Sequence, residues 1–391
     1  MSSHFPLHLD LRDRRVLVVG AGPVGLRRAA ALLAVGAAVE VVALQAEAEL
    51  PGIALSLRAF APTDLDGAWL VLACTGVIDD QIAALCEQRA QWCVRADDAA
   101  LSAAWVPAVA RVEDVVVSVT AGRDPRRAVA LRDAVALALD TGGLPLRRSR
   151  TGAGSVALVG GGPGDPDLLT VRGRRLLAQA DVVVRDRLAP HLALAAGVEV
   201  IEVGKTGGGP SWSQRDIEAL LVERARAGQR VVRLKGGDVH VFARGIEEVA
   251  ACLTAGVAVE VVPGISSALA GPTLAGIPVT GRGVNQFFTV VSAHLPPGDP
   301  GSTVDWDALA RLGGTVVLLM AIGRLAACCT ALIAGGRDAG TPVAVVQDAA
   351  LPTQRTVVTT LARAAVDAAG VSAPAVVVIG EVVDLRLVAT L

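Results

Sequence analysis

A pair of glycines flanked by opposite charges is the segment of this chain best suited to chemistry. Residues 231–238 read Val-Val-Arg-Leu-Lys-Gly-Gly-Asp, so a β-branched run enters Gly236 and Gly237 between Lys235 and Asp238. Adjacent glycines after a strand let a ligand approach the backbone where any Cβ would collide. Asp238 can accept hydrogen bonds from an amine or a hydroxyl. The segment is therefore predicted to form part of a ligand-binding site.

Lysine is rare in this chain, and its placement is informative. Of the 36 lysines and arginines, only Lys205 and Lys235 are lysines, and each lies beside a glycine at the end of a predicted strand. An ammonium group is compact and can lose its proton, whereas a guanidinium keeps its charge. One interpretation is that both positions require an ammonium group. The other is that both are ordinary surface lysines.

The composition indicates an α/β protein of the cytoplasm. The chain has 391 residues, 52% of them hydrophobic, which is enough for two or three domains with cores of Ala, Val and Leu. A net charge of −2 gives no overall attraction to nucleic acid or to an anionic membrane. No apolar run is long enough to span a bilayer, and the N-terminus lacks the pattern of a signal peptide. The six cysteines have no metal-ligand spacing, so we expect reduced thiols and no metal site.

The first half of the chain predicts a dinucleotide site. An apolar strand over 15–19 enters the segment 20–25, Gly-Ala-Gly-Pro-Val-Gly, and a helix over 26–34 and a second strand over 38–44 follow. This is the G-x-G-x-x-G pattern in its strand-turn-helix context. The free N–H groups at the start of the helix can bind a pyrophosphate, and a proline there costs little.

Two features of the first half are less regular. The acid expected on the ribose is absent, because the second strand ends in Leu44 and Gln45, and Glu40 lies inside the strand. Asp97 follows a strand-like run where the sheet edge would face a nicotinamide, although an ordinary surface loop has the same pattern. Strand-like runs also occur over 69–74 and 115–119.

The chain is predicted to divide near residue 150. A helix over 126–140 is followed by residues 141–155, which mix Gly, Pro and Ser with Arg, as linkers do. We therefore expect a first domain over 1–140, a linker over 141–155 and a second domain over 156–391.

The second domain opens with a loop that does not suit a phosphate. The strand over 156–159 enters Gly-Gly-Gly-Pro-Gly-Asp-Pro-Asp, with Pro163 followed by two acids where a phosphate-binding helix would begin. Carboxylates there would repel phosphate, so a zwitterion such as a methionine-derived sulfonium is the better candidate ligand.

Other strand ends carry candidate site residues. Asp186 lies between two arginines, which indicates either a general base or substrate clamp, or a solvated salt-bridge cluster. Ser266 and Ser267 follow a Pro-Gly turn, and Ser266 is suited to capping the next helix. Met320 ends a buried strand and could equally be core. The last strand, over 375–379, ends in Gly-Glu, and the repeated glycines predict one ligand cleft along the carboxyl edge of the sheet.

Taken together, these ordered motifs resemble the siroheme synthase family. In that family a precorrin-2 dehydrogenase and ferrochelatase domain is joined to a uroporphyrinogen-III C-methyltransferase. The resemblance is specific over 155–391, where it includes the segments 159–170, 232–238 and 276–280, and it is looser over 5–140. It implies an α/β fold with an N-terminal Rossmann-type NAD-binding domain and a two-lobed tetrapyrrole methylase domain of the class III S-adenosylmethionine methyltransferases.

The resemblance also implies residue roles. Asp186 matches the proton acceptor, Lys205 the proton donor, and Asp97 the acid credited with both dehydrogenation and metal insertion. The matches to the S-adenosylmethionine contacts are Pro163, Gly236, Gly237, Asp238, Val241, Ser266, Ser267, Met320 and Ala349. The matches to the NAD-binding loop and its flanking positions are Gly20, Gly22, Pro23, Val24, Gly25, Leu44 and Gln45.

The implied chemistry is methylation of uroporphyrinogen III to precorrin-2, then oxidation by NAD to sirohydrochlorin, which could receive Fe²⁺ as a substrate. The implied assembly is a homodimer. The chain departs from the family at Val239, His240, Gly281 and Ala349, and residues 141–155 replace a longer helical dimerisation segment. These departures leave open a related tetrapyrrole methylase with another substrate or ring position, and a first domain that binds without catalysis.

Overall fold

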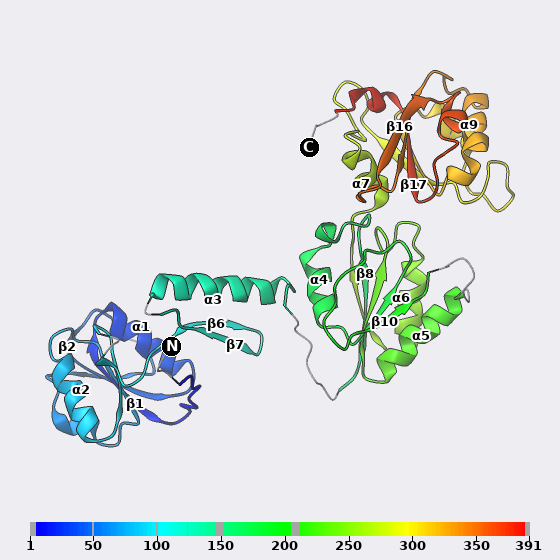
Figure 1. The fold of residues 1–391 in the computed structure, drawn as a ribbon. Helices are drawn as coiled ribbons and strands as arrows, with labels where there is room; N and C mark the ends of the chain where they lie inside the picture. The colour runs from blue at the N-terminus through cyan, green and yellow to red at the C-terminus, as the bar shows by residue number, and fades with distance from the viewer. Residues whose placement is uncertain are drawn as a thin grey trace. The chain divides into compact units, whose positions relative to one another are not determined.

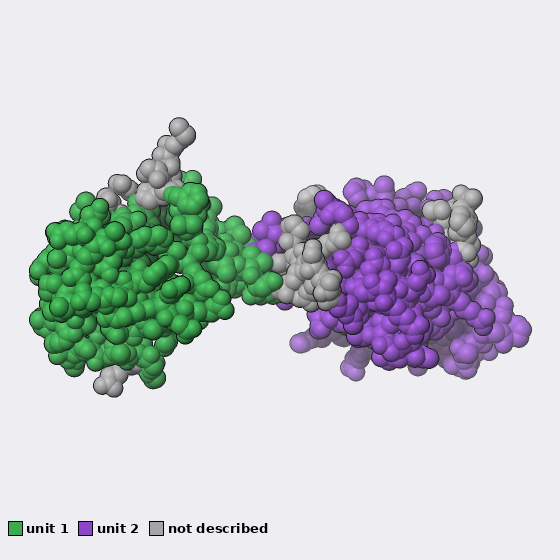
Figure 2. All heavy atoms as spheres, turned by 90° about the horizontal axis from the view of Figure 1, so that it is seen from below, with its two compact units in different colours: residues 1–137 green, residues 138–391 purple. Residues whose placement is uncertain are grey.

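The computed structural model describes residues 5–48, 51–98, 101–122, 124–144, 152–204 and 212–387. The chain forms two compact units, Met1–Leu137 and Ala138–Leu391, coloured separately in Figure 2. Residues 145–151, within the predicted linker, lie outside the described residues. Within those residues no helix is long and apolar enough to cross a membrane.

The first unit is built on a parallel five-stranded sheet in the order β3-β2-β1-β4-β5. Its strands are β1 (Arg15–Ala21), β2 (Ala38–Ala46), β3 (Ala54–Leu57), β4 (Leu70–Ala73) and β5 (Trp92–Arg95). Helix α1 (Pro23–Leu33) packs on one face, and α2 (Asp79–Gln88) packs with the short helix η1 (Pro62–Leu65) on the other. The β1–α1 loop lies where the strand order reverses, which is where ligands bind in open α/β sheets.

The predicted strand over 115–119 is present but does not belong to that sheet. β7 (Val115–Val119) pairs antiparallel with β6 (Ala108–Val112) in a hairpin of its own. Helix α3 (Pro125–Asp140) follows and agrees with the predicted helix within one residue. The strand itself is thus confirmed, whereas a valine-rich run does not specify which strand it pairs with.

The second unit has two sheets, and the first of them is entirely parallel, in the order β10-β9-β11-β8-β12. Its strands are β8 (Ser155–Gly160), β9 (Val182–Arg185), β10 (Glu199–Glu202), β11 (Arg230–Lys235) and β12 (Ala258–Val262). Helices α5 (Gln214–Arg226) and α6 (Gly245–Thr254) pack on one face and α4 (Val171–Ala178), after the short helix η3 (Pro166–Leu168), on the other (Figure 1). Because both faces are covered, β8 and β9 are nearly continuous apolar runs.

The second sheet of this unit is mixed, in the order β13-β14-β17-β15-β16. Its strands are β13 (Phe288–Ser292), β14 (Thr315–Leu319), β15 (Pro342–Gln347), β16 (Arg355–Thr360) and β17 (Ala375–Ile379). Helix α7 (Ser267–Leu274) packs on one face. The other face is covered by α8 (Trp306–Arg311), α9 (Leu325–Ala334) and α10 (Ala364–Asp367). Two short helices complete the lobe, η4 (Ile322–Arg324) and η5 (Glu381–Leu385).

The direction of β17 corrects one prediction. β17 runs antiparallel to β14 and β15, so Ile379 lies beside Val316 and Val343 at the start of those strands. Gly380 is therefore at the edge opposite Met320 and does not belong to the predicted cleft. The fold class itself is confirmed: an α/β chain with a Rossmann-type unit followed by a two-lobed unit.

Candidate active site

Three glycines at the ends of neighbouring strands lock the loops of the first lobe together. A Cβ on Gly160 would lie 2.5 Å from the Gly264 nitrogen, and one on Gly264 would lie 2.3 Å from the Gly237 oxygen. The backbones of Gly162 and Gly237 also exchange hydrogen bonds of 3.1 and 2.7 Å. Gly237 has φ +67°, a left-handed conformation that favours glycine. The loops after β8, β11 and β12 thus form one glycine-lined surface at the carboxyl edge of the sheet.

Asp238 connects two of these loops. Its Oδ1 accepts from the backbone N–H groups of His240 (2.8 Å) and Val241 (3.2 Å), and its Oδ2 accepts from Gly264 N–H (3.1 Å). The carboxylate therefore holds the β11 loop against the β12 loop in addition to any contact with a ligand. Val241, which this arrangement orients, has an exposed side chain.

The second lobe contributes a strained edge. Met320, Asp348 and Ala350 have φ angles of 58°, 50° and 70°, which non-glycine residues rarely adopt. They follow β14 and β15, which end at the same edge of the mixed sheet. Strain of about 1–3 kcal/mol at such positions is typical of functional sites. Met320 is also exposed, so the alternative that it is a core residue is wrong.

The two lobes meet at the loops that carry predicted residues. A Cβ on Gly164, next to Pro163, would lie 3.0 Å from Leu351 Cδ2, two residues beyond Ala349. Within the second lobe, Gln354 Nε2 donates to the carbonyl of Leu274 at the end of α7 (3.0 Å). Ser266 caps that helix, as predicted, by accepting from the N–H of Ala268 (3.3 Å), and Ser267 is its first residue.

Asp186 lies beside the glycine-lined surface. Its backbone N–H donates to the Leu234 carbonyl (3.0 Å), and a Cβ on Gly236 would lie 2.8 Å from the Cβ of Leu188. The Asp186 side chain is 31% exposed, and its Oδ1 accepts from Arg233 Nη2 at 2.6 Å. The buried Arg233 therefore orients the Asp186 carboxylate, and part of that carboxylate remains accessible to solvent. A general base that contacts a substrate needs both properties. Neither neighbouring arginine holds it: Arg185 pairs with Glu202.

Behind Asp186 is a buried charge cluster that sequence reasoning missed. Arg233 and Glu248 are 1% and 0% exposed, and Arg233 Nε lies 3.2 Å from Glu248 Oε1. Lys235 Nζ lies 2.9 Å from the same oxygen. Burial and the adjacent Arg233 lower the pKa of Lys235, and Glu248 and Asp186 oppose that shift. The rarity of lysine was the available signal in the sequence. The burial of Lys235 excludes its interpretation as a surface residue. Lys205 lies outside the described residues.

In the first unit, the three glycines of the β1–α1 loop have different surroundings. A Cβ on Gly20 would lie 2.4 Å from the Cys74 carbonyl oxygen, and one on Gly25 would lie 2.0 Å from the Gly20 oxygen. A Cβ on Gly22 would meet nothing within 4 Å. Gly20 and Gly25 therefore permit the tight turn and the helix packing, whereas Gly22 leaves open space for a ligand. Helix α1 begins at Pro23, followed by Val24, and has no acidic residue in its first turn, so the loop fits the pyrophosphate of NAD.

This arrangement predicts that Gly22→Asp weakens NAD binding at least about tenfold without lowering the melting temperature. The added carboxylate would repel a pyrophosphate, but Gly22 has φ −74° and its Cβ has room. Gly25→Ala is the contrasting variant, since its Cβ collides with backbone and stability should fall. Calorimetric NAD titration and thermal unfolding separate the two effects. Unchanged NAD affinity in Gly22→Asp would contradict this role of the loop.

The end of β2 carries no acid for a ribose. Leu44 and Gln45 are exposed there, and Glu40 forms an ion pair with Arg15 (2.5 Å). Glu40 lies within β2, as predicted, and it has a structural partner in Arg15.

Asp97 is held by Arg95 in a bidentate ion pair. Arg95 Nε and Nη2 donate to its two carboxylate oxygens at 3.0 and 2.6 Å, and Nη1 pairs with Asp80. The hydrogen bonds from Arg95 lower the pKa of Asp97. As oriented, the carboxylate is a weak proton acceptor. In the described part of the chain, no cluster of three or more His, Cys, Asp or Glu residues could hold a metal ion.

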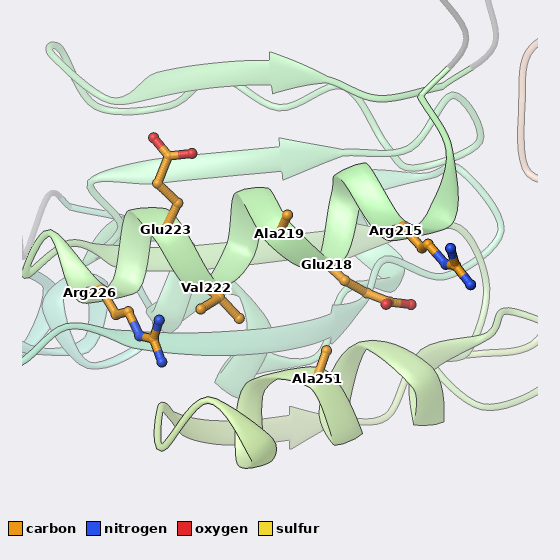
Figure 3. A pocket seen from close by; sticks show the side chains of 7 residues that line it. All are labelled: Arg215, Glu218, Ala219, Val222, Glu223, Arg226 and Ala251. Atoms are coloured by element: carbon orange, nitrogen blue, oxygen red, sulfur yellow. The ribbon is translucent and has the colours of Figure 1, made fainter.

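A separate surface groove lies between α5 and α6 (Figure 3). It encloses about 650 Å³, and Arg215 and Arg226 lie toward its two ends. None of the predicted site residues lines it.

Known proteins match both units. Tetrapyrrole (Corrin/Porphyrin) Methylases match residues 155–365, and a Putative NAD(P)-binding family matches residues 7–108. A siroheme synthase of Chromobacterium violaceum is 37% identical, over 97% of this chain and 95% of that protein.

Two more relatives each match about three-fifths of the chain. A uroporphyrinogen-III C-methyltransferase of Sinorhizobium sp is 49% identical over 60% of this chain and 85% of that protein. A uroporphyrin-III C-methyl transferase from Thermus thermophilus, complexed with S-adenyl homocysteine, is 43% identical with a TM-score of 0.51, over 59% of this chain and 99% of that one.

The fold, the glycine-lined loops and these matches define a tetrapyrrole methylase joined to an NAD(P)-binding unit. The match to a siroheme synthase over nearly the whole length of the chain identifies the family within this class of proteins. The chain belongs to the siroheme synthase family.

Proposed function

We propose that this chain transfers methyl groups from S-adenosylmethionine to uroporphyrinogen III to give precorrin-2, which its first unit oxidises with NAD to sirohydrochlorin. The observation that carries the proposal is a partly exposed carboxylate, Asp186, oriented by Arg233 at the edge of the glycine-lined surface. The relatives named as siroheme synthase and uroporphyrinogen-III C-methyltransferase support the substrate and the donor.

In the methylation, an electron-rich ring carbon attacks the sulfonium methyl. A C–C bond forms, the S–CH₃ bond breaks, and the sulfur leaves as a neutral thioether. The macrocycle then loses a proton, and we assign Asp186 as its acceptor. Lys205 is assigned as proton donor because it matches the family motif.

The surfaces described above would hold the donor beside this base. The proposed S-adenosylmethionine contacts are Pro163, Gly236, Gly237, Asp238, Val241, Ser266, Ser267, Met320 and Ala349. Aligning the two reactants would be the main contribution of the site. In the first unit the NAD contacts are assigned to the loop 20–25 with Leu44 and Gln45; NAD, when bound, accepts a hydride.

The test is mass spectrometry of the product made from uroporphyrinogen III and S-adenosylmethionine. Without NAD, two added methyl groups are expected; with NAD, the product should also lose two hydrogens. Gly22→Asp is the matched control and should stop at the dimethylated product. An NMR spectrum of that product with methyl groups at other ring positions would favour a different tetrapyrrole methylase. Absence of methylation would overturn the proposal.

Insertion of Fe²⁺ is proposed to be the slowest activity, because the carboxylate of Asp97 is engaged in an ion pair with Arg95. Arg95→Met should free Asp97, raise its pKa toward the ordinary value, and increase the rate of Fe²⁺ insertion severalfold. The appearance of siroheme absorbance after Fe²⁺ addition measures it. Arg89→Met, which removes an exposed pair with Asp66, is the control. An unchanged rate of Fe²⁺ insertion in Arg95→Met would show that the Arg95–Asp97 ion pair does not limit this activity.

We further propose a cytoplasmic homodimer. Leu131 and Leu137 on α3 are exposed apolar side chains that a second copy would cover. Light scattering of the purified chain measures the subunit number.

A further inference from the structure

We infer that Lys235 and Glu248 are positioning residues that set the charge state and orientation of the Asp186 carboxylate during methyl transfer. The juxtaposition that carries this inference is a buried lysine placed between two carboxylates, one buried and one open to the site. The inference rests on the proposed methyltransferase function.

The cluster is arranged as two cations that each bridge both acids. Arg233 donates from Nη2 to Asp186 Oδ1 at 2.6 Å and from Nε to Glu248 Oε1 at 3.2 Å. Lys235 Nζ lies 2.9 Å from Glu248 Oε1 and 3.9 Å from Asp186 Oδ2. A change in the interaction of Glu248 with Arg233 and Lys235 therefore changes the interaction of these two cations with Asp186.

The four groups differ in access to solvent. The side chains of Arg233, Lys235 and Glu248 are at most 3% exposed, whereas that of Asp186 is 31% exposed. With two cations and two anions the cluster is formally neutral, so removing one member leaves a net charge at low dielectric beside Asp186. Solvent cannot screen that charge as it would at the surface.

Glu248 is not arranged as a fully satisfied structural ion pair. Its Oε1 accepts from Lys235, Arg233 and, at 3.4 Å, from Gln214 Nε2. Its Oε2 is buried and has no hydrogen-bond partner among the described residues. A buried carboxylate oxygen without a partner is costly and calls for an explanation. We explain the buried Glu248 carboxylate by its effect on Arg233 and Lys235, the two cations that also interact with Asp186.

The other charged groups around the cluster are paired or farther from its centre. On α6, Glu247 pairs with Arg244, and both are well exposed. On β9, Arg185 pairs with Glu202. On α5, Glu218 lines the separate surface groove between α5 and α6. Among the described residues, the charged groups in direct contact with Lys235 are thus Glu248 and Asp186, with Arg233 adjacent.

The inference predicts pH shifts of opposite sign. Lys235→Met removes a cation and lets Glu248 compete harder for Arg233, so the acidic limb of the methyl-transfer pH profile should move up by about one unit. Glu248→Gln removes the competing anion, and both cations then act on Asp186, so the limb should move down by a similar amount. The double variant restores neutrality and should return the limb toward wild type.

Controls separate positioning from folding. Lys235→Arg keeps the charge and should keep the limb; Glu247→Gln, on the same helix but exposed, should leave it unchanged. Thermal unfolding and S-adenosylmethionine titration check each variant. If Lys235→Met fails to fold, Gln214→Glu provides the same test, because Gln214 contacts Glu248. The new carboxylate would compete with Asp186 for the two cations, so the acidic limb should move up. Shifts of the same sign, or a rate loss with no shift, would overturn the inference.

Failure of the proposed function is distinguishable. If wild type does not methylate uroporphyrinogen III, the Asp186 titration is followed directly by ¹³C NMR with labelled aspartate, assigned through Asp186→Asn. Opposite shifts of the Asp186 pKa in Lys235→Met and Glu248→Gln would support the cluster's role without any substrate. Absence of opposite shifts there would overturn it.

Discussion

Changing Asp186 to Asn is expected to lower the rate of methyl transfer by about 10²–10⁴-fold, the usual contribution of a positioned general base. The amide is nearly isosteric, and its oxygen can still accept from Arg233, which lies 2.6 Å from Oδ1 in the native protein. It cannot accept the proton that leaves the macrocycle. Single-turnover methylation measures the effect, and calorimetric titration should give S-adenosylmethionine affinity within about twofold of wild type.

Asp367→Asn is the matched control for this variant. Asp367 also pairs with an arginine, Arg363 at 2.8 Å, but follows β16, which ends at the opposite edge of the mixed sheet from Met320. Its loss should not change the methylation rate. If Asp186→Asn retained half of the native rate, the base would have to be another group, and the orientation of Asp186 by Arg233 would serve binding alone.

Strand ends were the predictable part of this site. Gly160, Gly237 and Gly264 each follow an apolar run, and parallel strands bring such ends to one edge. The rarity of lysine also singled out Lys235 before its surroundings were known. Asp97 and Arg95 are two residues apart, which places them on one side of an extended segment, so their pairing could have been anticipated from spacing.

Partners across the sequence were not predictable. Glu248 is one of two adjacent glutamates at the start of a helix, and nothing in that pattern distinguishes the buried Glu248 from the exposed Glu247. Arg233 lies within a strand, where charge alone does not identify its partners. The reversed direction of β17 was missed for a related reason, because a valine run carries no information about strand polarity. Each of these features depends on tertiary contacts.

Adding one methyl group at Gly160 is expected to weaken S-adenosylmethionine binding at least about tenfold and to destabilise the second unit by about 1–3 kcal/mol, the usual cost of overpacking. The new Cβ of Gly160→Ala would lie 2.5 Å from the Gly264 nitrogen and 2.8 Å from the Gly237 oxygen. Both neighbours are backbone, so relief requires the β11 and β12 loops to separate, and that would also pull Gly264 from Asp238.

Gly370→Ala makes the same chemical change where there is room, since its Cβ would meet nothing within 4 Å. Thermal unfolding and S-adenosylmethionine titration of the two variants isolate the effect of the loop contact. A Gly160→Ala variant that matched Gly370→Ala in both measurements would show that the loops can part without cost. The close approach of the three strand ends would then contribute nothing to donor binding, and Asp238 would be left as the main connection between the β11 and β12 loops.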